Sequence, residues 1–218
     1  MRIVTTMGVA LVVTAAVGTP ASYNDPARNT IPPPGPKMTQ PPAGALFWDN
    51  FSDAKLDGWT TTRDDAWSVH HGVLRGDLPD QPQTYAFIYA GRDDWRNYAL
   101  DFDVCGIRGV DKGGVVRVEG NDGVGADLRG PGYQDVLLHR GMIPMGRADA
   151  PNANGTWHHV RIEAKDDYYR VLIDGALKVV HRDKGEHRPR GRIALAAYTG
   201  GVGQCTVYYD NVVVTALK

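Results

Sequence analysis

The stretch "NGTWHHVRIEAKDDYYRVLIDGALKVVHRD", residues 154–183, decides the fold. Val, Ile, Tyr and Leu alternate with polar residues on both sides of Asp174-Gly175. A period of two is typical of strands with one buried face, and Asp-Gly is a strong signal for a two-residue hairpin turn. The stretch therefore predicts antiparallel strands over residues 156–164, 168–173 and 176–182.

The histidine pair in this stretch raises the question of a metal or catalytic site. Neighbouring side chains of a strand point to opposite faces, so His158 shares a face with Val160, and His159 shares one with Glu163. Two such histidines cannot hold one ion, whereas histidines four apart on a helix could. The second histidine pair is His70-His71. Its second histidine precedes Gly72, and His71-Gly72 indicates another tight turn. We interpret both pairs as structural.

The rest of the chain from Leu46 onward repeats the pattern. Short apolar or alternating runs are separated by Gly, Asp, Asn and Pro, and no segment has a sustained 3.6-residue period. The further candidate strands are residues 46–51, 67–71, 73–76, 85–90, 98–107, 113–120, 133–140, 192–198 and 206–214. About a dozen strands at this spacing predict an all-β sandwich of two antiparallel sheets.

The N-terminal region reads as an export signal followed by a spacer. Arg2 precedes the apolar run "MGVALVVTAAV" and the small residues "GTPAS", which predicts a secretory signal peptide over residues 1–21. The run is short for a bilayer span, so we expect a secreted protein, extracellular or cell-wall-associated, with no membrane span. Residues 22–44 hold seven prolines and predict a Pro-rich linker or a disordered tail before a domain over 45–218.

The net charge of the chain indicates which kinds of macromolecule it could bind. Lys and Arg together number 24 against 25 Asp and Glu, so there is no basic field to attract nucleic acid. We expect no nucleic-acid partner, and we expect a monomer.

Several of these runs, among them "LFWDNFSDAKLDGW", "WSVHHGVLRG", "RGRIALAAY" and "VYYDNVVV", resemble the concanavalin A-like jelly-roll superfamily. The resemblance is closest to the 3-keto-disaccharide hydrolase domain family and covers residues 46–216. It implies a sandwich with one convex and one concave sheet and a lectin-like, carbohydrate-binding function. A glycoside hydrolase of the 3-keto-disaccharide type is the alternative, and a cell-envelope adhesion domain is a second, because this fold carries all three.

The candidate binding residues come from strand alternation. It places one polar set opposite the core, on the face that we predict to be the concave one: Asp101, Asp103, Arg117, Glu119, Asp135 and His139. Trp95, Tyr133 and Tyr198 could supply aromatic contacts to a sugar. If the chain is a hydrolase, Asp135 and His139 are the catalytic candidates. For each residue the alternative is an ordinary solvated strand surface.

Arg117 is the expected centre of this face. Its planar guanidinium suits a carboxylate or neighbouring hydroxyls of a sugar. The alternative is a structural ion pair with Glu119 or Asp103. The related laminarinase-type chemistry is not expected, because "DFDVCG" lacks the third carboxylate of that motif.

Laminarinase-like relatives also imply a structural calcium ion on the convex side. The corresponding ligands here are Asp49, Asp210 and the carbonyl of Gly72, and such oxygens suit calcium. The alternative is that the two aspartates hydrogen-bond to loop amides.

Cys105 and Cys205 are the only cysteines, and export favours a disulfide between them. Their strands are neighbours in the implied sandwich. Alternation, however, places Cys105 with Asp103 and Cys205 with the apolar Val207, so pairing would need a bulge at Cys105-Gly106.

Overall fold

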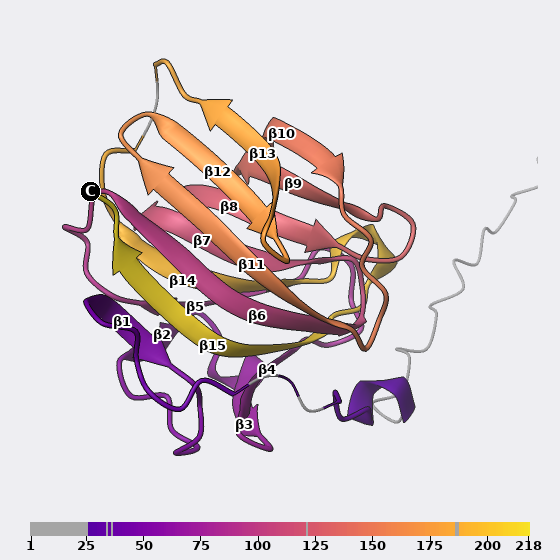
Figure 1. The fold of residues 1–218 in the computed structure, drawn as a ribbon. Coiled ribbons are helices and arrows are strands. Elements are labelled where there is room, and N and C mark those ends of the chain that lie inside the picture. Colours follow the sequence, from indigo (N-terminus) through magenta and orange to yellow (C-terminus); the bar gives the residue numbers. More distant parts are fainter. Residues whose placement is uncertain (1–25, 34, 36, 121, 186–187) are drawn as a thin grey trace, which may run out of the picture.

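The computed structural model describes residues 26–33, 35, 37–120, 122–185 and 188–218, and the predicted signal peptide lies outside them. Two antiparallel sheets pack face to face in this part of the chain (Figure 1). The prediction of an all-β, concanavalin A-like sandwich is confirmed. Among the helices of the same residues, none has the length and apolar character needed to cross a membrane.

Sheet A, at the front of Figure 1, contains the C-terminal strand. Its order is β13-β12-β11-β6-β15-β4-β3, and β1 pairs with the second half of β15. Its strands are β1 (Ala45–Asp49), β3 (Trp67–His70), β4 (Val73–Asp77), β6 (Tyr98–Arg108), β11 (Trp157–Lys165), β12 (Tyr168–Ile173), β13 (Ala176–Arg182) and β15 (Thr206–Ala216).

Sheet B lies behind it in the order β10-β9-β8-β7-β14-β5-β2. Its strands are β2 (Trp59–Thr61), β5 (Tyr85–Ala90), β7 (Asp111–Glu119), β8 (Asp122–Arg129), β9 (Asp135–Arg140), β10 (Ile143–Asp149) and β14 (Arg192–Tyr198). Three short 3-10 helices are η1 (Pro26–Asn29), η2 (Asp64–Ala66) and η3 (Gly200–Val202). The sequence analysis missed β2, β8 and β10, which are short or rich in glycine and polar residues.

The two predicted hairpin turns are present. Asp174 and Gly175 have φ values of 49° and 77°, and His71 and Gly72 have 53° and 72°. Positive φ at both central residues is what a tight β-hairpin of this type requires. His71 is thus a turn residue, as interpreted from the sequence.

The histidines of β11 also follow the predicted alternation. Val160 and Ile162 lie in the core between the sheets. His159 points to the outer side of sheet A, where it contacts Asp101 and Asp103. His158 instead contacts Asp174 in the hairpin turn, so the two imidazoles have separate partners.

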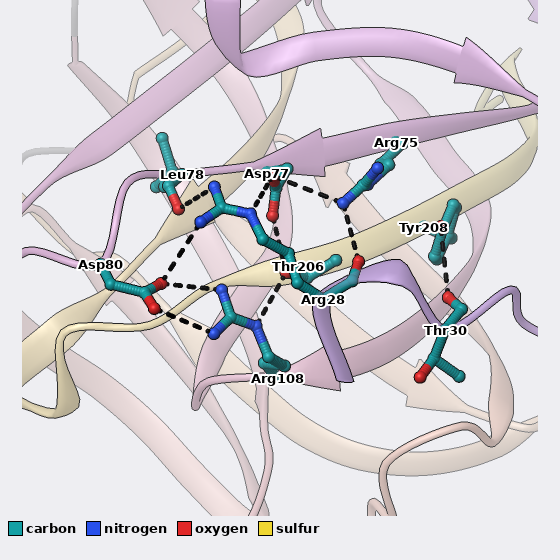
Figure 2. Close-up of polar contacts among 9 residues, drawn as sticks. All are labelled: Arg28, Thr30, Arg75, Asp77, Leu78, Asp80, Arg108, Thr206 and Tyr208. Carbon is teal, nitrogen blue, oxygen red and sulfur yellow. Dashed lines mark hydrogen bonds and ion pairs between the residues drawn. The ribbon is translucent and has the colours of Figure 1, made fainter. Parts of the chain in front are cut away.

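The segment that was expected to be a linker or tail lies against sheet A. We call residues 26–33, 35 and 37–44 the N-terminal strap. Arg28 is only 3% exposed, and its guanidinium donates to Asp77 Oδ2 at 2.7 Å and to the Leu78 carbonyl at 2.9 Å. Figure 2 shows Arg28 and Arg108 both directed at Asp80.

Further along the strap, backbone carbonyls accept hydrogen bonds from the sandwich. Tyr208 Oη donates to Thr30 O at 3.3 Å, and Trp157 Nε1 donates to Pro33 O at 2.6 Å. The composition argument failed here because it counted only apolar burial. Charged and hydrogen-bonded anchors hold the strap instead.

Both cysteines are buried, free thiols, which corrects the expected disulfide. Cys105 lies in a small apolar cluster on the outer side of sheet A with Val73, Ile107 and Tyr208. Cys205 lies in the main core. The register of β6 against β15 does shift between Thr206 and Val207, but the shift leaves Cys105 on the outer side.

We therefore expect quantitative thiol labelling of the denatured, unreduced chain to find two reactive thiols. Labelling of the folded protein should be slow, because burial raises the pKa of both Cys105 and Cys205 to about 11 and hides both sulfurs. Fewer than two thiols after denaturation would show that a disulfide forms.

We expect Arg28→Met to lower the free energy of unfolding by about 3–5 kcal/mol, because it removes a buried guanidinium that pairs with Asp77 and with the nearly buried carboxylate of Asp80. Arg92→Met is the matched control, since the Arg92–Asp94 pair is exposed to solvent and its loss should leave the unfolding midpoint nearly unchanged. Urea unfolding measures both. Equal unfolding midpoints for the two variants would contradict the anchoring role of Arg28.

Candidate functional site

The outer face of sheet B gathers aromatic rings, carboxylates and one histidine. Residues directly opposite one another on neighbouring strands share a face of the sheet. Three rows of such residues run across it: Tyr85, Tyr198 and Asp111; Phe87, Ala196, Gly113 and Asp127; and Tyr89, Ala194, Val115, Gly125 and His139. We call this surface the B face.

His139 and Asp127 form the polar centre of the B face. His139 Nδ1 donates to the carbonyl of Gly141 at 2.8 Å, and Nε2 lies 3.0 Å from Asp127 Oδ2. Both ring nitrogens face acceptors, so both carry protons and the imidazole is cationic. Burial works against this charge, but Asp127 outweighs it and raises the pKa of His139 to about 9.

Asp111 lies opposite Tyr198 at the start of β7. Burial and then the nearby charge of Asp127 raise the pKa of Asp111 to about 6. Near neutral pH the B face thus holds an imidazolium and a carboxyl group close to its titration point. Shifted groups on one face of a sheet are typical of functional sites.

Glycines in β8 make room for this cluster. A Cβ on Gly125 would lie 2.8 Å from His139 Nε2, so the imidazole can lie over the strand only because residue 125 has no side chain. A Cβ on Gly123 would lie 2.7 Å from Val115 Cγ1. A shallow hollow results, and its lining includes Phe87, Tyr89 and His139.

An aromatic row borders the hollow along β5. The rings of Tyr85 and Phe87 are 5.7 Å apart, and those of Phe87 and Tyr89 are 6.1 Å apart. Tyr85 is 58% exposed. An apolar ring surface beside a few directed polar groups is the usual composition of a small-molecule site.

Four of the predicted residues lie on or beside the B face: Tyr133, Asp135, His139 and Tyr198. Asp135 is 1% exposed, and both its oxygens accept from Arg129, at 2.7 and 2.8 Å. Burial raises the pKa of Asp135, but Arg129 and Arg147 more than offset this and hold it below its usual value. Asp135 is therefore neutralised by arginines, and the carboxylate partner of His139 is Asp127.

The two tyrosines are placed differently. Tyr133 is half-exposed, and the Arg129 guanidinium lies 4.1 Å from the centre of its ring. Tyr198 lies within the first row, between Tyr85 and Asp111, and its hydroxyl donates to Gln83.

Asp101 and Asp103 lie on the other sheet, which corrects the prediction of one shared face. Both contact His159 on the outer side of sheet A, at 3.2 and 2.8 Å. The hydrogen bonds that the His159 ring donates to Asp101 and Asp103 raise the pKa of His159 to about 9. Alternation tells which side of a strand a residue occupies, but it does not tell which sheet the strand joins.

Arg117 is buried rather than displayed, which corrects its predicted role at the centre of the face. It has φ of 53°, and the pairing of β7 with β8 and β14 shifts register around it. This bulge turns its guanidinium toward the carbonyls of Arg96 and Asp166, at 3.2 and 2.7 Å, and toward Asn97 Oδ1. Neither expected partner, Glu119 or Asp103, is among these contacts.

The remaining predicted residues lie at the edges. Glu119 is exposed at the end of β7, 3.7 Å from Arg188. Trp95 is half-buried in the β5–β6 connection, with its ring edge-on to Tyr98 at 5.9 Å. Neither side chain lies in the three rows of the B face.

The sequence analysis missed Asp111 and Asp127. Asp127 belongs to β8, whose sequence "DGVGADLR" reads as a loop because of its glycines. A usable signal was present, since Val124, Ala126 and Leu128 alternate and all three are buried in the core. Recognising that alternation would have placed Gly125 and Asp127 together on the opposite side.

The three expected calcium ligands do not share one set of contacts. Asp49 Oδ1 accepts from the Phe51 amide at 2.7 Å, and Oδ2 accepts from Trp59 Nε1 at 2.8 Å. Asp210 and the Gly72 carbonyl instead contact Lys37. Among the described residues, no three His, Cys, Asp or Glu side chains gather closely enough to hold a metal ion.

Comparison with known proteins identifies the family. The family model of the 3-keto-alpha-glucoside-1,2-lyase-like domain matches residues 46–215. No curated protein matches the chain.

Solved structures show the same fold. The carbohydrate-binding module CBM66 of Bacillus subtilis has a TM-score of 0.62 at 16% identity, over 73% of this chain and 96% of its own. The Bacillus licheniformis β-glucanase has a TM-score of 0.61 at 12% identity, over 81% of this chain and 100% of its own. A Bacillus subtilis protein with a galectin-like fold has a TM-score of 0.61 at 10% identity, over 79% of this chain and 96% of its own.

We expect Arg117→Met to destabilise the fold by at least about 3 kcal/mol, because it leaves the carbonyls of Arg96 and Asp166 without their donor. Arg170→Met removes an exposed arginine that pairs with Glu163 and should cost less than about 1 kcal/mol. Chemical denaturation compares the two. A fully stable Arg117→Met protein would show that the buried contacts do not matter.

Proposed function

We propose that this chain, a member of the 3-keto-alpha-glucoside-1,2-lyase-like domain family, binds a carbohydrate on the B face. The observation that carries the proposal is the Asp127–His139 pair, which shares the B face with Asp111, whose pKa is raised to about 6, and with a row of aromatic rings. The fold shared with a carbohydrate-binding module and a glucanase supports it. The predicted signal peptide supports a place of action outside the cell.

The B face carries the polar and aromatic groups that a sugar-binding site uses. Carboxylate oxygens of Asp127 accept hydrogen bonds from hydroxyls. The His139 imidazolium, whose two N–H groups face Asp127 and the Gly141 carbonyl, holds that carboxylate in place. The rings of Tyr85 and Phe87 offer flat apolar surface to the C–H side of a pyranose. The hollow is shallow and open along the sheet, which suits an oligosaccharide better than an enclosed small molecule.

We expect His139→Gln to weaken binding of any glycan found on an array by at least tenfold, because Asp127 loses the charged partner that holds it toward the ligand and a hydrogen bond to a charged group is worth about 1.5–3 kcal/mol. His159→Gln is the matched control, since His159 is also an imidazolium held by aspartates but lies on the outer side of sheet A. Titration calorimetry with the same glycan measures both. Equal affinities for the two variants, or a loss confined to His159→Gln, would place the site elsewhere.

A second candidate is eliminative cleavage of a 3-keto glucoside, which the family description and the shifted pKa values favour. A ketone at C3 acidifies the proton on C2. The Asp111 carboxylate would take that proton. His139 Nε2, which faces Asp127 in the free protein, would turn its N–H to the glycosidic oxygen and give it the proton as the bond to C1 breaks. The products are an enone with a C1–C2 double bond and the free alcohol.

This reaction would have a bell-shaped pH profile. Activity should rise as Asp111 ionises near pH 6 and fall as His139 loses its proton near pH 9. Turnover of a 3-keto glucoside, followed by absorbance of the enone, measures the profile. Asp111→Asn should abolish turnover while glycan binding persists. Binding with no turnover at any pH would leave the chain a binding protein and rule out the lyase.

A further inference from the structure

The Lys37 ammonium lies among three oxygen atoms from separate parts of sheet A. Its Nζ is 2.7 Å from Asp210 Oδ2 and 3.1 Å from the carbonyl of Asn50, and it also donates to the carbonyl of Gly72. Asn50 follows β1, Gly72 is in the β3–β4 turn, and Asp210 is in the middle of β15. An ammonium has three protons to donate, and three acceptors are present.

A hard metal cation could also bind to these three oxygen atoms. Two backbone carbonyls and a carboxylate are typical calcium ligands, and two of the three atoms belong to residues expected to hold calcium. Asp49, the third expected residue, hydrogen-bonds to Phe51 and Trp59 instead. With Lys37 in place, the residues present do not fit a calcium ion, because the ammonium holds the position at which the oxygens converge.

The carboxylate of this arrangement is buried. Asp210 is 1% exposed, and burial raises its pKa while Lys37 lowers it. A carboxylate this deep needs a cation close by. Lys37, in the N-terminal strap, is that cation. The ion pair between Lys37 and Asp210 therefore holds the strap against sheet A.

The residue after Lys37 extends the attachment. The Met38 amide donates to Asn211 Oδ1 at 2.8 Å, and Asn50 Nδ2 donates to the Met38 carbonyl at 2.7 Å. Arg28 anchors the other end of the strap between Asp77 and Asp80. The strap is therefore held at two points by cationic side chains, each reaching a buried aspartate.

We propose that Lys37 occupies a cation position built by the Asn50 and Gly72 carbonyls and Asp210, and that this built-in cation replaces calcium and latches the N-terminal strap onto sheet A. The latch works with no metal in solution. It also makes the position available to calcium only when Lys37 is removed.

The test is thermal unfolding of the full chain in chelator and in excess calcium chloride. The wild-type protein should melt at the same temperature in both. Lys37→Met should melt about 5–10 °C lower in chelator, because Asp210 loses its counter-charge, and calcium should restore part of that loss. Lys55→Met, which removes an exposed lysine of the β1–β2 loop, should match the wild type in both solutions.

A double variant separates a cation position from general destabilisation. Lys37→Met with Asp210→Asn lacks the carboxylate, so calcium should restore nothing. The proposal is overturned if calcium raises the melting temperature of the wild type, if Lys37→Met melts with the wild type in chelator, or if calcium restores none of the loss in Lys37→Met. The wild-type measurement alone can still overturn the proposal if Lys37→Met does not fold.

Discussion

The irregular step at Asp210-Asn211 in β15 is the constraint on which much of the molecule depends. Asn211 has φ of 49°, and the register of β15 against β6 shifts between Asp210 and Val213. Before the step β15 pairs with β4, and after it with β1. The step leaves a carboxylate and an amide inside a packed sheet, where Asn211 donates to Asp103 and Asp210 faces Lys37. Because buried polar groups need partners, this one step ties β6, the β1 edge and the strap together.

The polar groups on the two outer faces of the sandwich find their partners in different ways. On sheet A, carboxylates and cations alternate in a continuous network, in which His159 and Arg161 bridge Asp101, Asp103 and Glu163. Part of the same side is covered by the strap, so the face is saturated by the chain itself. On sheet B, the carboxyl group of Asp111 has a raised pKa beside a second aspartate, and the rings of β5 are exposed. A saturated face suits a structural role, whereas the B face still has hydrogen-bonding capacity and apolar surface for a ligand.

Strand alternation in the sequence predicted most of the fold, and its failures have physical causes. It identified the sandwich, the Asp174-Gly175 turn and the opposite orientations of Cys105 and Cys205, because these depend on local periodicity and turn chemistry. It misplaced Arg117 because one bulge reverses the direction of every side chain that follows. It missed Asp127 because β8 uses glycine where an imidazole lies over the strand. It treated the strap as unattached because a long-range contact such as Lys37 to Asp210 leaves no local pattern.

Proton linkage shows what the two shifted groups of the B face do for stability. The pKa of His139 is about 9, above its unfolded value, so the stability it contributes is present below about pH 6.5 and is lost as the pH rises through 9. The pKa of Asp111 is about 6, also above its unfolded value, so the fold binds that proton more tightly and loses stability as Asp111 ionises between about pH 4 and 6. At neutral pH the protein therefore keeps the gain from His139 and bears the cost of an ionised Asp111. An asparagine at position 111 would avoid that cost, so stability does not explain the carboxylate there, which agrees with the ligand-binding role proposed for the B face.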